Sequence, residues 1–312
     1  MANEDRLQAL LEQLTEMEQM ESREELDGLS QLAKEILSLD PLNPRAKLAL
    51  WASLEEDEAA KSLYLLEEAL DAVRPLVNEG TPGMPEDDIN AETYGASLEC
   101  LSVFNYNLEN YEKALAFAKE LVAFDDEGLY EGRIPLYCAL LKLEKHTDIL
   151  SALDADPLET LVGEYARAFA HHGMGEEEDA LESLLQAISM APDLPFFILG
   201  IWGIPEEDED IDEEMEDLLH QAMALSEPCL SSPANVAFMC QPVYMLGYLT
   251  DRISDPEELE LLEKDFEQRD IADQMQEAKD RIFEMIDKEQ TQEEIDEEAL
   301  QAVHAILQGE KE

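Results

Sequence analysis

Three aspartates come nearest to a metal site in this sequence: Asp208, Asp210 and Asp212, in one acidic run. Alternating carboxylates of this kind begin the calcium loop of an EF-hand. That loop also needs glycine at its sixth position and glutamate at its twelfth, and here those positions hold Glu213 and Leu219. The sequence therefore predicts a solvated charge run at this place rather than a calcium site.

The histidines and the nucleophile motifs offer no better candidate for chemistry. His171 and His172 are neighbours, so on a helix their side chains point about 100° apart and cannot grip one ion together. His146, His220 and His304 each lack a second ligand at helical spacing. The sequence contains no phosphate-binding loop, no Gly-x-Ser-x-Gly and no His-Glu-x-x-His. We therefore predict no enzyme, no catalytic residue, no bound metal and no cofactor.

Helical hairpins, rather than reactive groups, dominate the middle of the chain. Residues 95–106 are apolar at helical spacing, and after a turn at 108–110 the same spacing continues to about residue 124. The pattern returns in residues 161–192, which break at Gly-Met-Gly near residue 174 and stop at Pro192. Small alanines recur where two helices must approach closely. The pattern predicts paired antiparallel helices.

The spacing of the helix ends indicates a repeat. A shorter pair, residues 133–153, lies between the two clear hairpins. Helix ends at Asp126, Pro157 and Pro192 are 31 and 35 residues apart. The tetratricopeptide repeat has a period of about 34 residues. An ordinary helical bundle, which also shows 3.6-residue periodicity, remains the alternative.

From these patterns we predict an all-α fold, a tetratricopeptide-like α-solenoid of stacked helical hairpins with an acidic helical C-terminal extension. The repeat domain is expected over residues 1–250, with its clearest units in 95–192. Residues 251–312 form an acidic helical cap or tail, and Asp255 and Thr291 are expected to cap its helices. We also expect one amphipathic helix over residues 1–28 and one long helix over residues 56–77.

The charge of the chain limits its partners. Lys and Arg number 20 against 76 Asp and Glu, and the net charge is −56. A field of that sign repels phosphates, so we predict no nucleic-acid partner and no anionic membrane partner. A basic protein would instead be attracted, with strong salt dependence. We favour the simpler interpretation, in which the acidity only keeps the protein in solution or reflects a salt-adapted or acid-biased proteome.

Cysteine usage and hydropathy point to a cytoplasmic protein. Cys100, Cys138, Cys229 and Cys240 form no Cys-x-x-Cys pair, and most lie in apolar helical stretches as small hydrophobic residues do. Free thiols suggest a reducing compartment. The first residues lack the basic and apolar regions of a signal peptide, and no 18-residue apolar run follows. We therefore expect a cytoplasmic location.

Two segments carry a family resemblance: residues 107–150, NLENYEKALAFAKELVAFDDEGLYEGRIPLYCALLKLEKHTDIL, and residues 165–200, YARAFAHHGMGEEEDALESLLQAISMAPDLPFFILG. They resemble tetratricopeptide-repeat proteins, and in particular bacterial relatives of the suppressor-of-tumorigenicity-type repeat family. The resemblance implies a helical-repeat fold and a role as scaffold or adaptor. The chain departs from that family in its strong acidity and in its helical tail after residue 251.

The first helix of each predicted hairpin should line a concave surface where a partner binds. Ten side chains would face that surface: Glu99, Val103, Tyr106, Asn107, Tyr130, Arg133, Tyr137, Tyr165, Phe169 and His172. Aromatic side chains and arginine are typical anchors of a peptide site, although the same rings could instead pack between neighbouring repeats. We predict a non-enzymatic scaffold or adaptor that binds a peptide or helix. The alternative is an acidic decoy or chaperone-like protein that binds basic proteins by charge, in imitation of nucleic acid.

Overall fold

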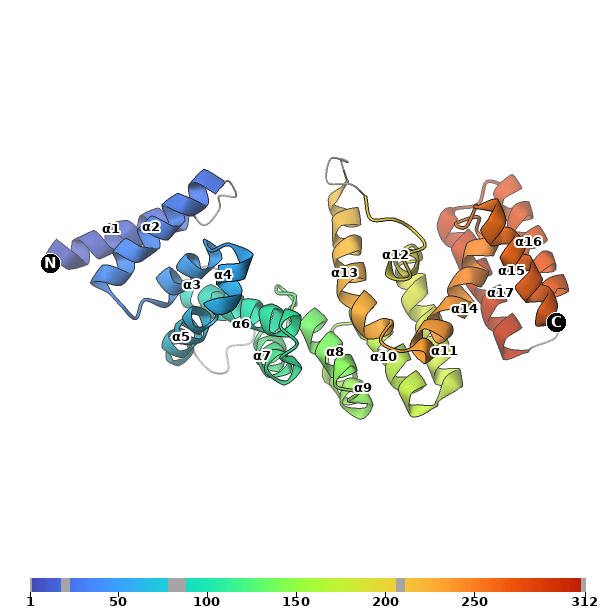
Figure 1. The fold of residues 1–312 in the computed structure, drawn as a ribbon, viewed down its shortest axis with the longest axis horizontal. Helices are drawn as coiled ribbons and strands as arrows, with labels where there is room; N and C mark the ends of the chain where they lie inside the picture. The colour runs from blue at the N-terminus through green and yellow to red at the C-terminus, as the bar shows by residue number, and fades with distance from the viewer. Residues whose placement is uncertain (1, 18–22, 78–87, 206–210, 310–312) are drawn as a thin grey trace. The chain divides into compact units, whose positions relative to one another are not determined.

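The computed structural model of the chain describes residues 2–17, 23–77, 88–205 and 211–309, and these fold into helices and turns with no strand among them. The contacts divide the chain into two compact units, Met1–Ala139 and Leu140–Glu312, and each is described by itself (Figure 1). No helix in the described part of the chain is both long and apolar enough to cross a bilayer.

The first unit contains the helices up to the point of division, which falls inside α8. In chain order these are α1 (Ala2–Met17), α2 (Arg23–Leu39), α3 (Pro44–Ala52), α4 (Glu56–Lys61), α5 (Tyr64–Val73), the 3₁₀-helix η1 (Arg74–Leu76), α6 (Ile89–Asn107), α7 (Tyr111–Phe124) and α8 (Arg133–Lys142). Helices α1, α2 and α3 pack one on the next, α5 packs on both α3 and α6, and α6 and α7 form the most extensive pair of the unit. The prediction of a helical pair around the turn at 108–110 is confirmed.

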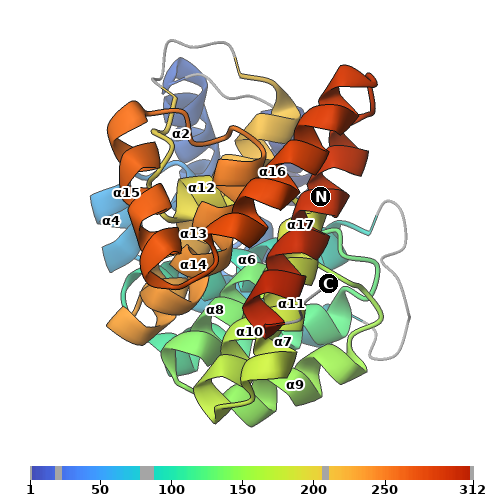
Figure 2. The same cartoon turned by 90° about the vertical axis from the view of Figure 1, so that its right-hand side faces the viewer.

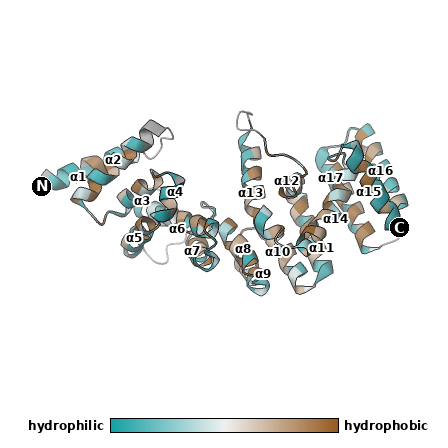
Figure 3. Cartoon of the chain, viewed as in Figure 1, coloured by the Kyte–Doolittle hydropathy of each residue, from teal (hydrophilic) through white to brown (hydrophobic). Residues whose placement is uncertain are grey.

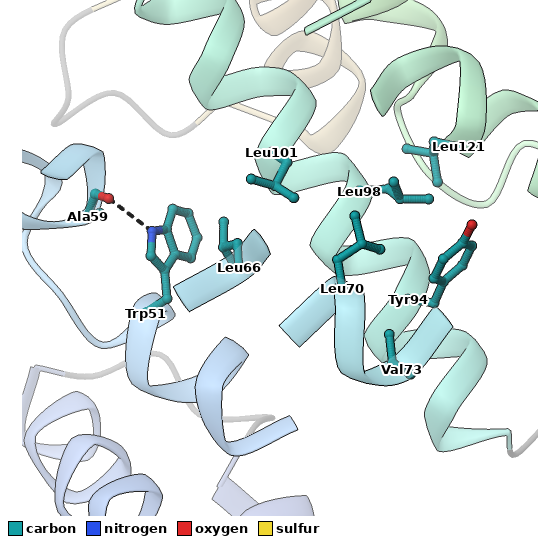
Figure 4. Close-up of a cluster of buried hydrophobic side chains, with 9 residues drawn as sticks. All are labelled: Trp51, Ala59, Leu66, Leu70, Val73, Tyr94, Leu98, Leu101 and Leu121. Atoms are coloured by element: carbon teal, nitrogen blue, oxygen red, sulfur yellow. Dashed lines mark hydrogen bonds between the residues drawn. The ribbon is translucent and has the colours of Figure 1, made fainter. Parts of the chain in front are cut away.

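Helices α3, α5 and α6 share a core (Figure 4). Leu66, Leu98 and Leu101 are fully buried there, and Trp51 closes one side. The indole N–H of Trp51 donates to the backbone oxygen of Ala59 at 3.0 Å. A smaller cluster of buried apolar residues joins α1, α2 and α3.

Two of the helices expected near the N-terminus are each divided. The prediction of one helix over 56–77 is wrong, because α4 ends at Lys61 and α5 begins at Tyr64. The Ala59 oxygen accepts from Trp51 and from the Ser62 N–H, which tightens the last turn of α4. The single helix expected over 1–28 is likewise wrong, because α1 ends at Met17 and α2 begins at Arg23.

The second unit contains the remaining helices. They are α9 (His146–Ala155), α10 (Leu161–Met174), α11 (Glu177–Met190), α12 (Leu194–Ile198), α13 (Glu213–Cys229), α14 (Pro233–Leu249), α15 (Pro256–Gln268), α16 (Ala272–Asp287) and α17 (Gln292–Gln308). The pair α10 and α11 is the most extensive among the described helices, and the prediction of a hairpin over 161–192 is confirmed. Helix α17 packs against α11, α14 and α16 (Figure 2).

The helices after residue 251 begin where local signals predict. Asp255 caps α15 by accepting the N–H groups of Glu257 and Glu258. Thr291 and Glu294 form a complete capping box at the start of α17. Both predicted caps are confirmed. Helix α15 is largely hydrophilic (Figure 3), and of its 13 residues, all described, only Phe266 is buried.

Candidate functional site

The predicted partner-facing residues of α6 lie near the C-terminal end of that helix. Asn107 is exposed, whereas Val103 and Tyr106 are half-buried. The Tyr106 ring contacts the Tyr111 ring of α7, with centroids 5.3 Å apart. These residues are accessible in part, and contact between them and a partner stays a prediction.

Glu99 and Tyr130 hold the α7–α8 connection against α6. The Glu99 carboxylate accepts the backbone N–H of Glu131 at 2.8 Å, and burial raises the pKa of this carboxyl above its usual value. The Tyr130 ring lies over Gly95, where a Cβ atom would come within 2.3 Å of a ring carbon. Its hydroxyl donates to the backbone oxygen of Glu92 at 3.2 Å, and burial raises its pKa to about 12. Most of the Tyr130 ring therefore serves intramolecular packing.

Arg133 and Tyr137 are buried. The buried Asp125 carboxylate accepts the N–H groups of Leu129 and Tyr130 at 2.9 and 2.8 Å, which orders the segment before α8. The Arg133 guanidinium lies 3.5 Å from the backbone oxygen of Asp125. Tyr137 has no exposed surface. A partner on the surface of the folded chain would not reach the Tyr137 ring.

The three predicted residues of α10 belong to the second unit, and α14 of the same chain covers two of them, Phe169 and His172. Tyr165 is fully buried, and burial raises its pKa well above the usual value. Phe238 of α14 meets the Phe169 ring edge-on at 5.5 Å and stacks on the His172 ring at 4.3 Å. Because Phe238 occupies this face, a partner there would have to displace α14.

A histidine cluster joins α10 to α11, which the sequence reasoning missed. His171 Nδ1 lies 2.7 Å from a Glu176 carboxylate oxygen, and His172 Nδ1 lies 3.3 Å from Glu177. Side-chain ligand atoms of His171, Glu176 and Asp179 all lie within 4.8 Å of one another, close enough to hold a divalent cation together. The signal in the sequence is a histidine five residues before a glutamate across a helical turn. The histidine–carboxylate hydrogen bonds account for this arrangement without an ion.

A groove runs between α11 and α17, two helices that lie side by side in the second unit (Figure 2). Its volume is about 770 Å³. Leu185 and Leu300 lie at its floor, almost fully buried, and Met190 is 43% exposed. The lining residues are Glu182, Leu185, Gln186, Ser189, Met190, Pro192, Glu293, Asp296, Glu297, Leu300, Gln301 and His304. We call this feature the α11–α17 groove.

A buried ion cluster supports one wall of the α11–α17 groove. The Arg252 guanidinium donates to both carboxylate oxygens of Asp296 at 2.5 and 2.9 Å, and to Asp193 at 2.7 Å. Burial disfavours the charged guanidinium, but the hydrogen bonds to Asp296 and Asp193 outweigh it and raise the pKa of Arg252. Asp296 is therefore paired, so its charge is compensated within the fold. The cluster ties the start of α12, the segment after α14 and the first turns of α17 together.

A second hollow continues along the same two helices. Its volume is about 410 Å³, and Glu177, Glu178 and Leu181 of α11 line it with Leu307 of α17. Phe238 of α14 contributes to its wall. Lining residues thus recur at intervals of three and four along both helices, so one stripe of each helix faces the hollows.

The acidic run that resembles a calcium loop has a structural role where it is described. Asp212 caps α13 and accepts the backbone N–H of Met215 at 2.9 Å. Asp208 and Asp210 lie outside the described residues. The prediction that this run is not a calcium site stays a prediction.

Comparison with known proteins adds no relative to this description. No family model, no curated protein and no solved structure matches the chain. The resemblance of residues 107–150 and 165–200 to tetratricopeptide-repeat proteins therefore stays a prediction.

Proposed function

We propose that this chain is a non-enzymatic interaction scaffold that binds a peptide or a helix of another protein. One observation carries the proposal: the α11–α17 groove presents an exposed methionine and an apolar floor between two well-packed helices. A groove of this size accommodates several side chains of a polypeptide. Apolar surface of this kind in a groove with a polar rim is typical of a binding site.

The helical hairpins α6–α7 and α10–α11 support the coarser part of the proposal. In repeat proteins such pairs stack to form an extended surface for partners. We propose that these pairs are tetratricopeptide-like units of a cytoplasmic protein. We also propose that Val103, Tyr106 and Asn107 contact a partner and form a further binding region.

The charge of the chain favours a second candidate function. A net charge of −56 would let the protein act as an acidic decoy for basic proteins. In that case charge anywhere on the surface would contribute, and binding would fall steeply with salt. The two functions differ because a groove demands apolar anchors at defined positions.

Selection from a random-peptide display library against the immobilised full chain tests the scaffold proposal. We expect enriched peptides to share spaced apolar anchors and to slow amide hydrogen exchange in α11 and α17 on binding. Selection in 0.5 M salt separates the two candidates, since the decoy would lose its ligands there. If the library yields no saturable ligand either at low salt or at 0.5 M salt, the scaffold proposal is refuted.

A further inference from the structure

The rim of the α11–α17 groove is acidic on both sides. Glu182 of α11 and Glu293 and Glu297 of α17 are exposed, and no lysine or arginine occurs among its described lining residues. Asp296 adds little to the rim, because Arg252 pairs with it. Exposed carboxylates on both sides of an apolar floor, with no cationic side chain among the described lining residues, favour a cationic occupant over an anionic one.

The apolar part of the groove favours an occupant that carries large apolar side chains in addition to positive charge. Met190 is exposed beside the buried Leu185 and Leu300, so a large apolar side chain would find contacts there that water cannot make. Methionine also adapts its shape to different ligands. Charge alone therefore does not describe what fits this surface.

The two helices that wall the groove favour a helical occupant over an extended one. Both walls are helices, whose backbone groups are already paired, so an extended peptide would find no backbone partners in the walls. A helix satisfies its own backbone and lies between two helices as ridges pack into grooves. From Glu177 to Met190 the lining stripe of α11 spans about 20 Å, which matches roughly three and a half turns of helix.

A second copy of this chain is a poor occupant. Each copy carries a net charge of −56, and the groove rim would face another acidic surface. Like charges brought together across an interface repel each other and suppress association. The occupant is therefore a different polypeptide of opposite charge.

We propose that the α11–α17 groove selects a cationic amphipathic helix of a partner protein. Its apolar side chains contact Met190, Leu185 and Leu300, and its lysines and arginines lie against Glu182, Glu293 and Glu297. The second hollow, with Glu177 and Glu178, extends the same recognition toward the other end of α11. This inference rests on the proposed scaffold function and gives its partner class.

The test uses the full chain and three synthetic peptides of about 18 residues, five helical turns. The first places leucine on one helical face and lysine on the other. The second has the same composition in scrambled order, and the third replaces each lysine by glutamate. Fluorescence anisotropy gives the dissociation constants at 50 mM and 300 mM salt. We expect the first peptide to bind most tightly at both concentrations.

Matched variants locate the binding site. The triple variant Glu182→Gln/Glu293→Gln/Glu297→Gln should weaken the first peptide roughly tenfold at low salt and reduce its salt dependence. Met190→Ser should weaken it roughly fivefold through lost apolar contact. All four side chains are exposed, so the fold should tolerate both changes.

Control variants on α15 carry the same changes away from the groove. The triple variant Glu258→Gln/Glu263→Gln/Glu267→Gln alters the net charge equally, and Leu261→Ser removes an apolar side chain that is 65% exposed. Both should bind the first peptide within twofold of the unaltered chain. Circular dichroism confirms that each variant is folded.

Each other result overturns a different statement. If the scrambled basic peptide binds as well and both triple variants lose equal affinity, the groove does not select and the charge decoy replaces it. If the glutamate peptide binds best and the groove variants weaken it, the partner class is wrong while the scaffold function stands. If no peptide binds and the display selection also fails, the scaffold function itself is wrong.

Discussion

The Arg252 cluster allows a stability prediction that the structure makes quantitative. The Arg252 side chain is 11% exposed and the Asp296 side chain 8%, whereas Asp193 is 43% exposed. Arg252→Met keeps much of the aliphatic stem but leaves the Asp296 carboxylate buried without a counter-ion. Breaking such a buried pair costs about 3–5 kcal/mol. Asp193→Asn should cost about 1 kcal/mol or less, because that carboxylate is largely solvated.

The two tryptophans of the chain make the measurement specific. Trp51 lies in the first unit, so Trp51→Phe leaves Trp202 as the only indole in the sequence. The Trp202 ring stacks on Phe196 at 5.0 Å, and its N–H donates to the backbone oxygen of Arg252. Its fluorescence during urea unfolding and during thermal unfolding therefore reports on the second unit. For a unit of this size we expect Arg252→Met to lower the melting temperature by roughly 6–20 °C.

A double variant tests the cause. In Arg252→Met/Asp296→Leu both buried charges are gone, and apolar replacement of a buried ion pair is often close to neutral. We expect the double variant to regain most of the stability that Arg252→Met loses. If Arg252→Met costs less than about 1 kcal/mol, or if the double variant is no more stable than the single one, the assignment of the cost to an unpaired buried charge is refuted.

Three smaller predictions concern a backbone position, a thiol and a phenol. Gly175 has φ 77° with nothing within 4 Å of a Cβ, so Gly175→Ala should cost about 1 kcal/mol in urea unfolding, whereas Gly203→Ala, also unobstructed, should be near neutral. Burial raises the pKa of Cys100 to about 12, so this thiol should react slowly at pH 8. Peptide mapping after treatment with Ellman's reagent at pH 8 should find Cys100 unmodified in the native chain and modified in the unfolded chain. Rapid modification of Cys100 in the native chain would contradict this prediction. Burial and the Glu120 hydrogen bond raise the pKa of Tyr94 from 10 to about 12. The neutral phenol therefore contributes to the free energy of unfolding in full below pH 10, and this contribution should decline as the pH rises to 12. In urea unfolding measured across this pH range, Tyr94→Phe should flatten the decline, and an unchanged decline would contradict the shift.

Features set by neighbouring residues could be read from the sequence. The caps at Asp255 and Thr291 depend on side chains within three residues, and both occur as predicted. The hairpins α6–α7 and α10–α11 follow from helical periodicity and short turns. The helix expected over 56–77 is divided after Lys61, and the Ala59 oxygen near the end of α4 accepts from Trp51, a contact that the periodicity of residues 56–77 does not reveal.

The candidate site depends on contacts between distant residues, which periodicity does not predict. The spacing of α10 shows that Phe169 and His172 share a face, but not that Phe238 of α14 covers it. In the same way, the stripes of α11 and α17 are visible in the sequence, whereas their adjacency across about 100 residues is not. The groove therefore emerges only from the tertiary structure.

The late position of α17 has a consequence for how the protein is made. Helix α11 ends at Met190 and α17 begins at Gln292, so the ribosome adds about 100 residues before the two can meet. At ordinary elongation rates this takes roughly 5–20 s. During that interval the surface of α11 that α17 later covers stays open to water and to other nascent chains. Biosynthesis of the second unit therefore has a window in which a chaperone that shields apolar surface should improve its yield.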